Sequence, residues 1–318
     1  MGIKNYQKNG FTLIEISIVL AIIGLIASGV LIGKELIAAA TLRAQITQLE
    51  QYRLALSTFR LKYGNYLPGD IPEPKASMFG FQPRGTIKGT GDGDGVLEMG
   101  NSCGHYKQSG GETGMFWADL ADANLINGDF TSMTADMVPD DFISHSGAEL
   151  NAYFPRAKIG AGNFVYVWSG GSNNTTSPCS AGGDNTNYFG ISAVSLMING
   201  LIYPAQNGSA GLTVLQAYSL DQKLDDSLPN AGTITTMTSG VGGVGFAKKP
   251  LSIWMYGAAT MTATGYTPTT AATIGDSDTC YDNSTSSDGQ TAANGNVMHY
   301  STQMNAGSGN NCALSFRF

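Results

Sequence analysis

Hydrophobic residues fill the start of the chain almost without interruption. Residues 11–33 contain a single ionisable side chain, that of Glu15. About 20 apolar residues span a bilayer at a rise of 1.5 Å per residue. The ten preceding residues carry Lys4 and Lys8, and positive charge before an apolar segment keeps that end in the cytoplasm. The pattern predicts one transmembrane helix over residues 11–33, with the N-terminus inside and the rest of the chain exported.

A periodic pattern follows over residues 34–64. Apolar residues recur there at steps of three and four and no proline interrupts them, so we expect the same helix to continue to Tyr63 as an amphipathic segment. Gly64-Asn65, with Pro68 just beyond, is a typical helix stop. This second half is expected to pack on the chain's own sheet through its apolar stripe, which comprises Leu42, Ile46, Leu49, Tyr52, Leu56, Phe59 and Tyr63.

Residues 65–318 are expected to form an exported globular domain. A helical repeat of apolar residues predicts a helix at 114–126, and a T-x-x-Q capping box at Thr213 and Gln216 predicts another at 214–226. The stretch 257–311 is rich in Thr, Ser, Gly and Asn and is expected to form long loops. The predicted strands are Asn163–Trp168, Tyr188–Met197, Leu251–Tyr256 and Ala313–Phe318.

Composition excludes several classes of protein. The chain has 318 residues, of which 42% are hydrophobic and 13% charged, so it is too apolar and too poor in charge to be disordered. The 42 glycines indicate a fold with many turns. The net charge of −7 argues against a general nucleic-acid-binding surface, which needs clustered Lys and Arg. No nucleic-acid partner is expected.

The entrance to the apolar segment carries a specific motif. Residues 8–15, with the sequence KNGFTLIE, resemble the leader junction of type IV pilins and type II secretion pseudopilins. The resemblance implies that residues 1–10 are a leader, that a prepilin peptidase cuts between Gly10 and Phe11, and that the new Phe11 amine is methylated. A secretory signal peptide is the alternative, but the apolar run exceeds the usual length of about 7–15 residues, and an acid at its entrance is unusual.

The resemblance also implies a fold and a role for Glu15. The fold would be a pilin-like α+β fold, in which the long helix packs on an antiparallel sheet in a loop-rich, disulfide-bonded domain. A carboxylate buried in a filament core needs a partner, and in this family the N-terminal amine of a neighbouring subunit supplies it. Glu15 is therefore the expected assembly residue. The alternative is that Glu15 merely ends the helix at the lipid headgroups. Many pilins have proline where this chain has Ile32.

The partners implied by the resemblance are other pilin or pseudopilin subunits, the prepilin peptidase and methyltransferase, and the inner-membrane assembly platform. The precursor would lie in the inner membrane, and the mature subunit in a pilus or pseudopilus, in the periplasm or at the cell surface.

Four cysteines support export. Cys103, Cys179, Cys280 and Cys312 form an even set without a C-x-x-C pair, and their spacings do not suit a compact zinc site. Four cysteines allow three pairings. In the pilin family that the chain resembles, a disulfide closes a loop onto the last strand. The resemblance therefore implies a Cys280–Cys312 disulfide, which leaves Cys103 to pair with Cys179.

An Asp-rich loop is the main candidate for metal binding. Residues 92–97, with the pattern D-x-D-G-x-L, match part of a calcium loop, although Thr90 and Asn101 stand where further ligands belong. A solvated Gly-Asp turn is the alternative, and no other cofactor is indicated. A second acidic group, at 221, 225 and 226, is expected to be a solvated helix face. The candidate calcium ligands are Asp92, Asp94, Val96 and Glu98.

Enzymatic activity finds no support in the sequence, because no nucleophile-elbow, zinc-protease or Walker A pattern occurs. The expected function is a structural subunit of a type IV pilus or pseudopilus. The size of the exported domain favours a minor or tip subunit. The alternative is a membrane-anchored exported binding protein or hydrolase that uses the helix as a tether.

Overall fold

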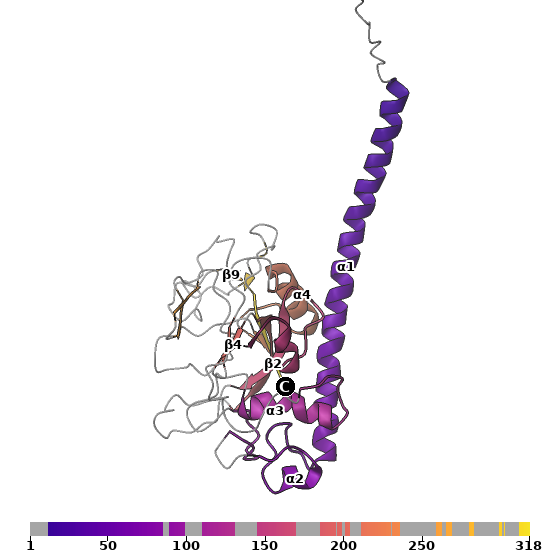
Figure 1. Ribbon diagram of the computed structural model, residues 1–318. Coiled ribbons are helices and arrows are strands. Elements are labelled where there is room, and N and C mark those ends of the chain that lie inside the picture. The colour runs from indigo at the N-terminus through magenta and orange to yellow at the C-terminus, as the bar shows by residue number, and fades with distance from the viewer. Residues whose placement is uncertain are drawn as a thin grey trace, which may run out of the picture.

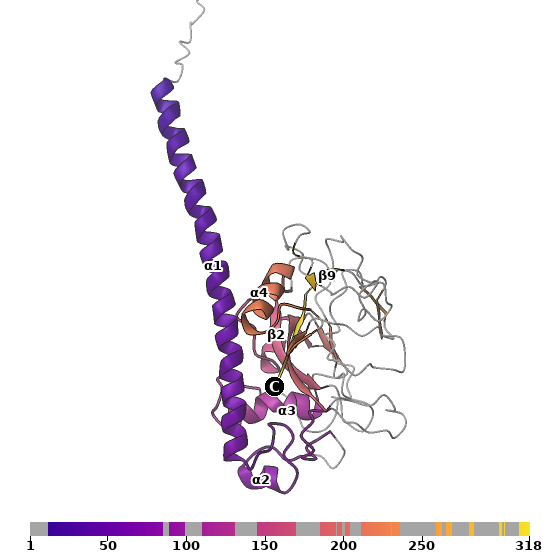
Figure 2. The same ribbon diagram turned by 180° about the vertical axis from the view of Figure 1, so that it is seen from behind.

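A long helix and a domain packed on its second half make up the molecule (Figure 1). Figure 2 shows the same arrangement from behind, with the first half of the helix extending away from the domain. This is the expected α+β architecture, and it is confirmed in the computed structural model. The structure describes residues 12–84, 89–98, 110–130, 145–169, 185–194, 196–198, 201–203, 211–229, 231–235, 259–262, 265–268, 280–282, 299–300, 302 and 312–318.

Helix α1 spans Leu13–Lys62. It ends because Gly64 and Asn65 take positive φ values of 75° and 71°, which a continuing right-handed helix does not allow. The sequence predicted its extent and its apolar stripe correctly, since every member of the stripe is buried except the half-buried Ile46. The stripe alone did not predict that Gln45 and Gln48 are also buried, at 0% and 5% exposure.

The main sheet has four antiparallel strands in the order β2-β3-β11-β6. Every described side chain of β2 and β3 is buried, so the sheet is covered on both faces. The end of the chain supplies β11, which lies between β3 and β6. The strands are β2 (Asn163–Ser169), β3 (Asn187–Ala193), β11 (Leu314–Arg317) and β6 (Ile234–Thr235).

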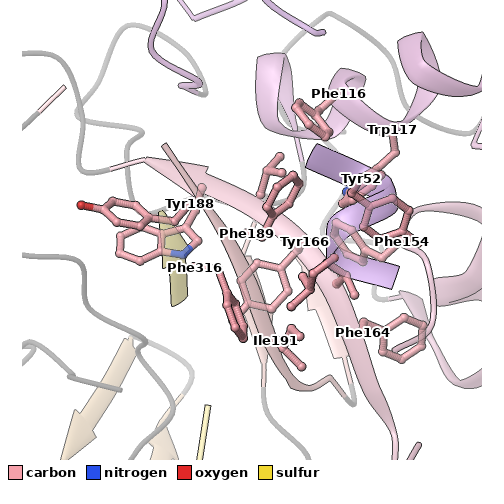
Figure 3. Packing of buried hydrophobic residues seen from close by; sticks show 14 of the residues in the cluster. Tyr52, Phe116, Trp117, Phe154, Phe164, Tyr166, Tyr188, Phe189, Ile191 and Phe316 are labelled. Atoms are coloured by element: carbon pink, nitrogen blue, oxygen red, sulfur yellow. The ribbon is translucent and has the colours of Figure 1, made fainter. Parts of the chain in front are cut away.

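Aromatic side chains join the sheet to α1 and α3 (Figure 3). The Tyr52 ring of α1 lies 4.9 Å from the Trp117 ring, and the Trp117 ring lies 6.2 Å from that of Phe189 on β3. Burying such rings supplies much of the folding free energy of a domain. The helices of the domain are α2 (Lys75–Phe79), α3 (Gly111–Asp122) and α4 (Val214–Leu224), and a 3-10 helix spans Gly147–Ala152.

Element boundaries differ from the predictions in three places. Helix α3 ends at Asp122 rather than at 126, because Asn124 takes a φ of 58°. The strand predicted over Tyr188–Met197 is two strands: β3 ends at Ala193, and β4 (Leu196–Ile198) joins another sheet. The predicted strand Leu251–Tyr256 lies outside the described residues. The second sheet has the order β1-β4-β5, with β1 at His145–Ser146 and β5 at Leu201–Tyr203.

The expectation of long loops over 257–311 is wrong where short strands form. Strand β7 (Ala259–Thr262) pairs with β8 (Gly265–Pro268), and β9 (Tyr281–Asp282) pairs with β10 (His299–Tyr300). Thr and Tyr favour extended backbone, and this preference outweighed the turn-rich composition.

A disulfide joins Cys280 to Cys312, with the two Cα atoms 5.1 Å apart. This is the pairing that the pilin resemblance favoured, and it fixes β9 beside the segment that leads into β11. Cys103 and Cys179 lie outside the described residues.

Candidate functional site

The first turn of α1 is closed by a capping box. The Thr12 backbone N–H donates to Glu15 Oε2 at 2.8 Å, and the Glu15 N–H donates to Thr12 Oγ1 at 3.3 Å. The Thr12 hydroxyl also donates to Glu15 Oε2, at 2.8 Å. The T-x-x-E pattern of Thr12 and Glu15 is typical of a capping box. From the sequence alone, these residues were interpreted only as part of the leader motif, so the cap was not predicted. Glu15 therefore has a local structural role in addition to the predicted one. Gly10 and Phe11 lie outside the described residues.

Beyond this cap, the first half of α1 is not covered by the part of the chain that the structure describes. Leu25 is 79% exposed and Leu31 is 64% exposed, and the most apolar 18-residue window of α1 has a mean hydropathy of 2.6 with none of its residues buried. Among the described residues, α1 is the one helix long and apolar enough to cross a membrane. Such a surface is unstable in water, so the geometry calls for a bilayer or other helices around it.

The Asp-rich loop folds around two buried carboxylates. Asp70 accepts the N–H groups of Gly93 and Gly95 at 2.6 and 2.8 Å. Glu112, in the first turn of α3, accepts those of Gly91 and Glu98, each at 2.8 Å. Both acids are 1% exposed. The loop conformation is therefore set by residues outside it.

Burial disfavours the charged form of both acids. It raises the pKa of Asp70 to about 7, and the nearby charges of Asp94 and Asp92 act in the same direction. Burial, together with the charge of Asp70, raises the pKa of Glu112 well above its usual range. Gly91 is required in this loop, because its φ is +104° and a Cβ there would lie 2.7 Å from the Ile71 carbonyl oxygen.

The predicted calcium ligands are only partly brought together. Asp92 and Asp94 lie close to each other, and their companion is Asp70, with one carboxylate oxygen of each acid within 4.8 Å of the others. Glu98 is buried beside Glu112 and does not belong to this group. Asp70 was not among the ligands predicted from the sequence. Three carboxylates at this spacing are oxygen ligands of the kind that Ca²⁺ takes, so calcium binding stays a prediction, with Asp70 added to the candidate ligands.

The second acidic group has a structural role. Asp221 is 0% exposed, so the prediction of a solvated face is wrong for this residue. It accepts the Tyr300 hydroxyl at 2.6 Å and the Ser227 N–H at 3.1 Å, and burial raises its pKa to about 7. Asp225 accepts the N–H of Ile234 at 2.8 Å, which connects the end of α4 to β6. These carboxylates act as hydrogen-bond acceptors that fix α4 in the domain.

Residues 5–31 match the family model of the prokaryotic N-terminal methylation motif. The chain carries a pilin-type methylation motif. The match starts before the expected cleavage point and ends within the exposed half of α1, so it supports membership of the type IV pilin and pseudopilin family. No curated protein and no solved structure matches the chain.

The methylation motif gives the uncovered half of α1 a functional context. It supports a processed, pilin-like subunit that is anchored in a membrane by α1, associates with other subunits of that kind and is a substrate of a prepilin peptidase. Glu15 is the acid inside the motif. Its two side-chain hydrogen bonds both involve Oε2. Since a carboxylate has about four acceptor positions, Glu15 retains the capacity to accept a further donor.

Proposed function

We propose that this protein is a structural subunit of a type IV pilus or a type II secretion pseudopilus, present as a minor or tip subunit. The observation that carries the proposal is a methylation motif leading directly into about 30 Å of uncovered apolar helix, while the second half of the same helix is packed in a folded domain. Residues 65–318 form a large exported part, and this size supports the minor or tip assignment.

Cleavage after Gly10 would place a cationic amine at Phe11, next to the capping residue Thr12. The amine of one subunit and the Glu15 carboxylate of the next would neutralise each other once both enter a low-dielectric helix bundle. The capping box supports this role, because it holds the Glu15 side chain in one position at the start of the helix. The proposed cation needs access to Oε1, which receives neither of the two bonds from Thr12.

The test is the N-terminus of the mature protein together with a Glu15 variant. Mass spectrometry is expected to find a chain that begins at a methylated Phe11. Glu15→Ala should leave cleavage largely intact but reduce incorporation into filaments at least about tenfold, equivalent to the loss of about 1.4 kcal/mol or more. A matched Thr12→Ala variant removes the cap and keeps the carboxylate, so it separates helix capping from assembly. A mature chain that still begins at Met1 would favour the tethered binding protein or hydrolase instead.

A further inference from the structure

A groove of about 680 Å³ lies beside the second half of α1. Gln51, Leu54 and Thr58 of α1 form one wall. The loop that follows α3 and the segment that follows the 3-10 helix form the opposite wall. A concave volume of this size falls within the range of about 300–1,000 Å³ that is typical of binding sites.

The charged residues that line the groove are both cations. They are Arg156 and Lys158, which are exposed, and neither forms an ion pair with another described residue. The Arg156 Nε–H donates to Asn151 Oδ1, and the guanidinium lies 5.2 Å from the centre of the Phe164 ring, so its position is fixed. In a chain with a net charge of −7, two unneutralised cations in one groove favour an anionic ligand.

Apolar side chains on both walls narrow the class of anion. Leu54 is 68% exposed on the wall formed by α1, and Leu125 and Ile126 are half-buried on the opposite wall. A nucleic acid would need exposed aromatic rings for its bases, whereas Tyr52 and Phe154 in this groove are buried. The ligand that fits therefore combines negative charge with apolar side chains, as a polypeptide does.

Two side-chain amides indicate the conformation of such a polypeptide. Gln51 on one wall and Asn127 on the other have no hydrogen bond to another described residue. Each amide offers donors and an acceptor, which match the N–H and C=O of a peptide unit. A helix uses these backbone groups internally, whereas an isolated extended segment leaves them free. Its successive side chains also point to opposite sides, so acidic and apolar residues can face different walls.

We propose that this groove binds an extended acidic segment of another protein, in which acidic and apolar residues alternate. Arg156 and Lys158 pair with its carboxylates, and Leu54 contacts its apolar side chains. The stretch of α1 from Gln48 to Thr58 is about 15 Å long, which corresponds to four or five extended residues at about 3.3 Å each. The inference goes beyond the proposed function and does not depend on it, because the groove belongs to the domain rather than to the membrane segment.

The experiment uses the full-length protein in detergent micelles and an array of short, fluorescently labelled synthetic peptides. In each peptide Glu, Gln or Lys alternates with Leu or Ser, and fluorescence anisotropy measures the affinity. Peptides that alternate Glu with Leu are expected to bind at least tenfold more tightly than those with Gln or Lys in place of Glu, or with Ser in place of Leu. Affinities that do not depend on charge, or an array in which no peptide binds, would overturn the proposal.

A charge reversal places the site in the groove. Lys158→Glu is expected to weaken the binding of the Glu-Leu peptides at least tenfold and to strengthen that of the Lys-Leu peptides. The backbone N–H of Lys158, which donates to Gln48, is not altered by this change. Lys223→Glu is the matched control, because Lys223 is an exposed lysine on α4 that does not line the groove, and it should change either affinity less than twofold. Equal effects of the two variants would contradict the proposed site.

A second matched pair tests the apolar wall. Leu54 and Leu215 are both exposed leucines on helices, at 68% and 50%, and only Leu54 lines the groove. Leu54→Asp is expected to weaken binding of the Glu-Leu peptides at least tenfold, whereas Leu215→Asp should change it less than twofold. Thermal unfolding confirms that all the variants are folded. Unchanged binding in Leu54→Asp would show that the peptides bind elsewhere.

Two further measurements separate this proposal from its alternatives. Sedimentation without peptide is expected to give the same mass for the wild type and for Lys158→Glu. A wild-type dimer that Lys158→Glu dissociates would make a second copy the occupant and would overturn the proposal. A chain that is processed to a methylated Phe11 but binds no peptide would leave the proposed function standing and the groove assignment wrong. An intact leader with peptide binding would do the reverse.

Discussion

The two halves of α1 belong to one helix and depend on different partners. Leu25, in the first half, is 79% exposed, whereas Phe59, in the second half, is 0% exposed and lies with its ring 4.5 Å from that of Tyr63. Helical backbone hydrogen bonds alone stabilise neither half much, because most helix stability in proteins comes from packing. The first half therefore depends on a bilayer or neighbouring subunits, and the second depends on the domain of its own chain.

Buried amides reinforce this contrast. Gln48 Nε2 donates to the Arg156 carbonyl oxygen at 2.9 Å, and Gln48 Oε1 accepts the Lys158 N–H at 3.1 Å. Gln45 Oε1 accepts the Ile159 N–H at 3.1 Å. Backbone groups of the domain are thus paired with side chains of the helix. The chain is therefore divided functionally within a single continuous helix rather than at a linker.

The largest expected effect comes from breaking the second half. Phe59→Ala should destabilise the domain by about 3–5 kcal/mol, because it removes a fully buried ring and leaves a cavity. The matched change in the first half, Ile23→Ala, removes an exposed side chain and should alter domain stability by less than about 0.5 kcal/mol. Thermal unfolding of the full-length protein in detergent, followed by near-UV circular dichroism, measures both. A similar loss in the two variants would show that the halves are not independent.

Calcium should stabilise the domain and leave the first half of α1 unaffected. If Asp70, Asp92 and Asp94 bind the ion, adding Ca²⁺ at about 100 times its dissociation constant should raise the free energy of unfolding by about 2.7 kcal/mol. Mg²⁺ should do less, because it needs a tighter octahedral site. The readout is the melting temperature with Ca²⁺ and with a chelator.

A matched pair of acids controls the calcium experiment. Asp94 Oδ1 accepts the N–H of Val96 at 2.8 Å, and Asp226 Oδ1 accepts that of Leu228 at 2.9 Å, so both cap a turn two residues ahead. Asp94→Asn should abolish the response to Ca²⁺, whereas Asp226→Asn should preserve it. Equal responses in the two variants would remove Asp94 from the candidate ligands.

Features carried by local pattern were predictable from the sequence. The buried stripe of α1 follows from helical periodicity, and the start of α4 follows from the Thr213–Gln216 capping box, whose two bonds are 2.9 and 3.1 Å long. The motif at residues 5–31 lies in one contiguous stretch, which is why the family resemblance was visible.

Features that depend on distant parts of the chain were not predictable. Asp70 meets Asp92 and Asp94 across more than 20 residues, and no pattern links an L-P-G-D turn to a Gly-Asp loop. Gln48 pairs with a backbone carbonyl 108 residues away, and the spacing of the apolar residues in α1 gives no sign of this contact. Glu98 is an acid in the right loop, but its burial beside Glu112 depends on how α3 packs.

The smallest expected effect is a pH dependence located in the domain. Burial raises the pKa of Asp221 to about 7, above its value of about 4 in an unfolded chain, so the folded state binds the proton more tightly. The stability that Asp221 contributes is fully present below about pH 4 and is lost as the pH rises through 7. The melting temperature should therefore fall by about 2–5 °C between pH 5 and pH 8.

An Asp221→Asn variant isolates this effect, because the amide keeps an acceptor oxygen for the Tyr300 hydroxyl and does not titrate. It should reduce the decrease between pH 5 and pH 8 by the share that Asp221 contributes, and the remainder is expected from the buried Asp70, whose pKa is also raised to about 7. Glu15→Gln, in the first half of α1, makes the same chemical change far from any contact with the domain and should leave the decrease unchanged. Glu73 has the opposite effect on the pH dependence of stability, but only at lower pH. The hydrogen bond from the Arg84 N–H lowers the pKa of Glu73 below its usual value, so the stability that it contributes is lost only as the pH falls. If Glu15→Gln flattened the profile instead, the stability of the domain would depend on the first half of the helix, and the division within α1 would be wrong.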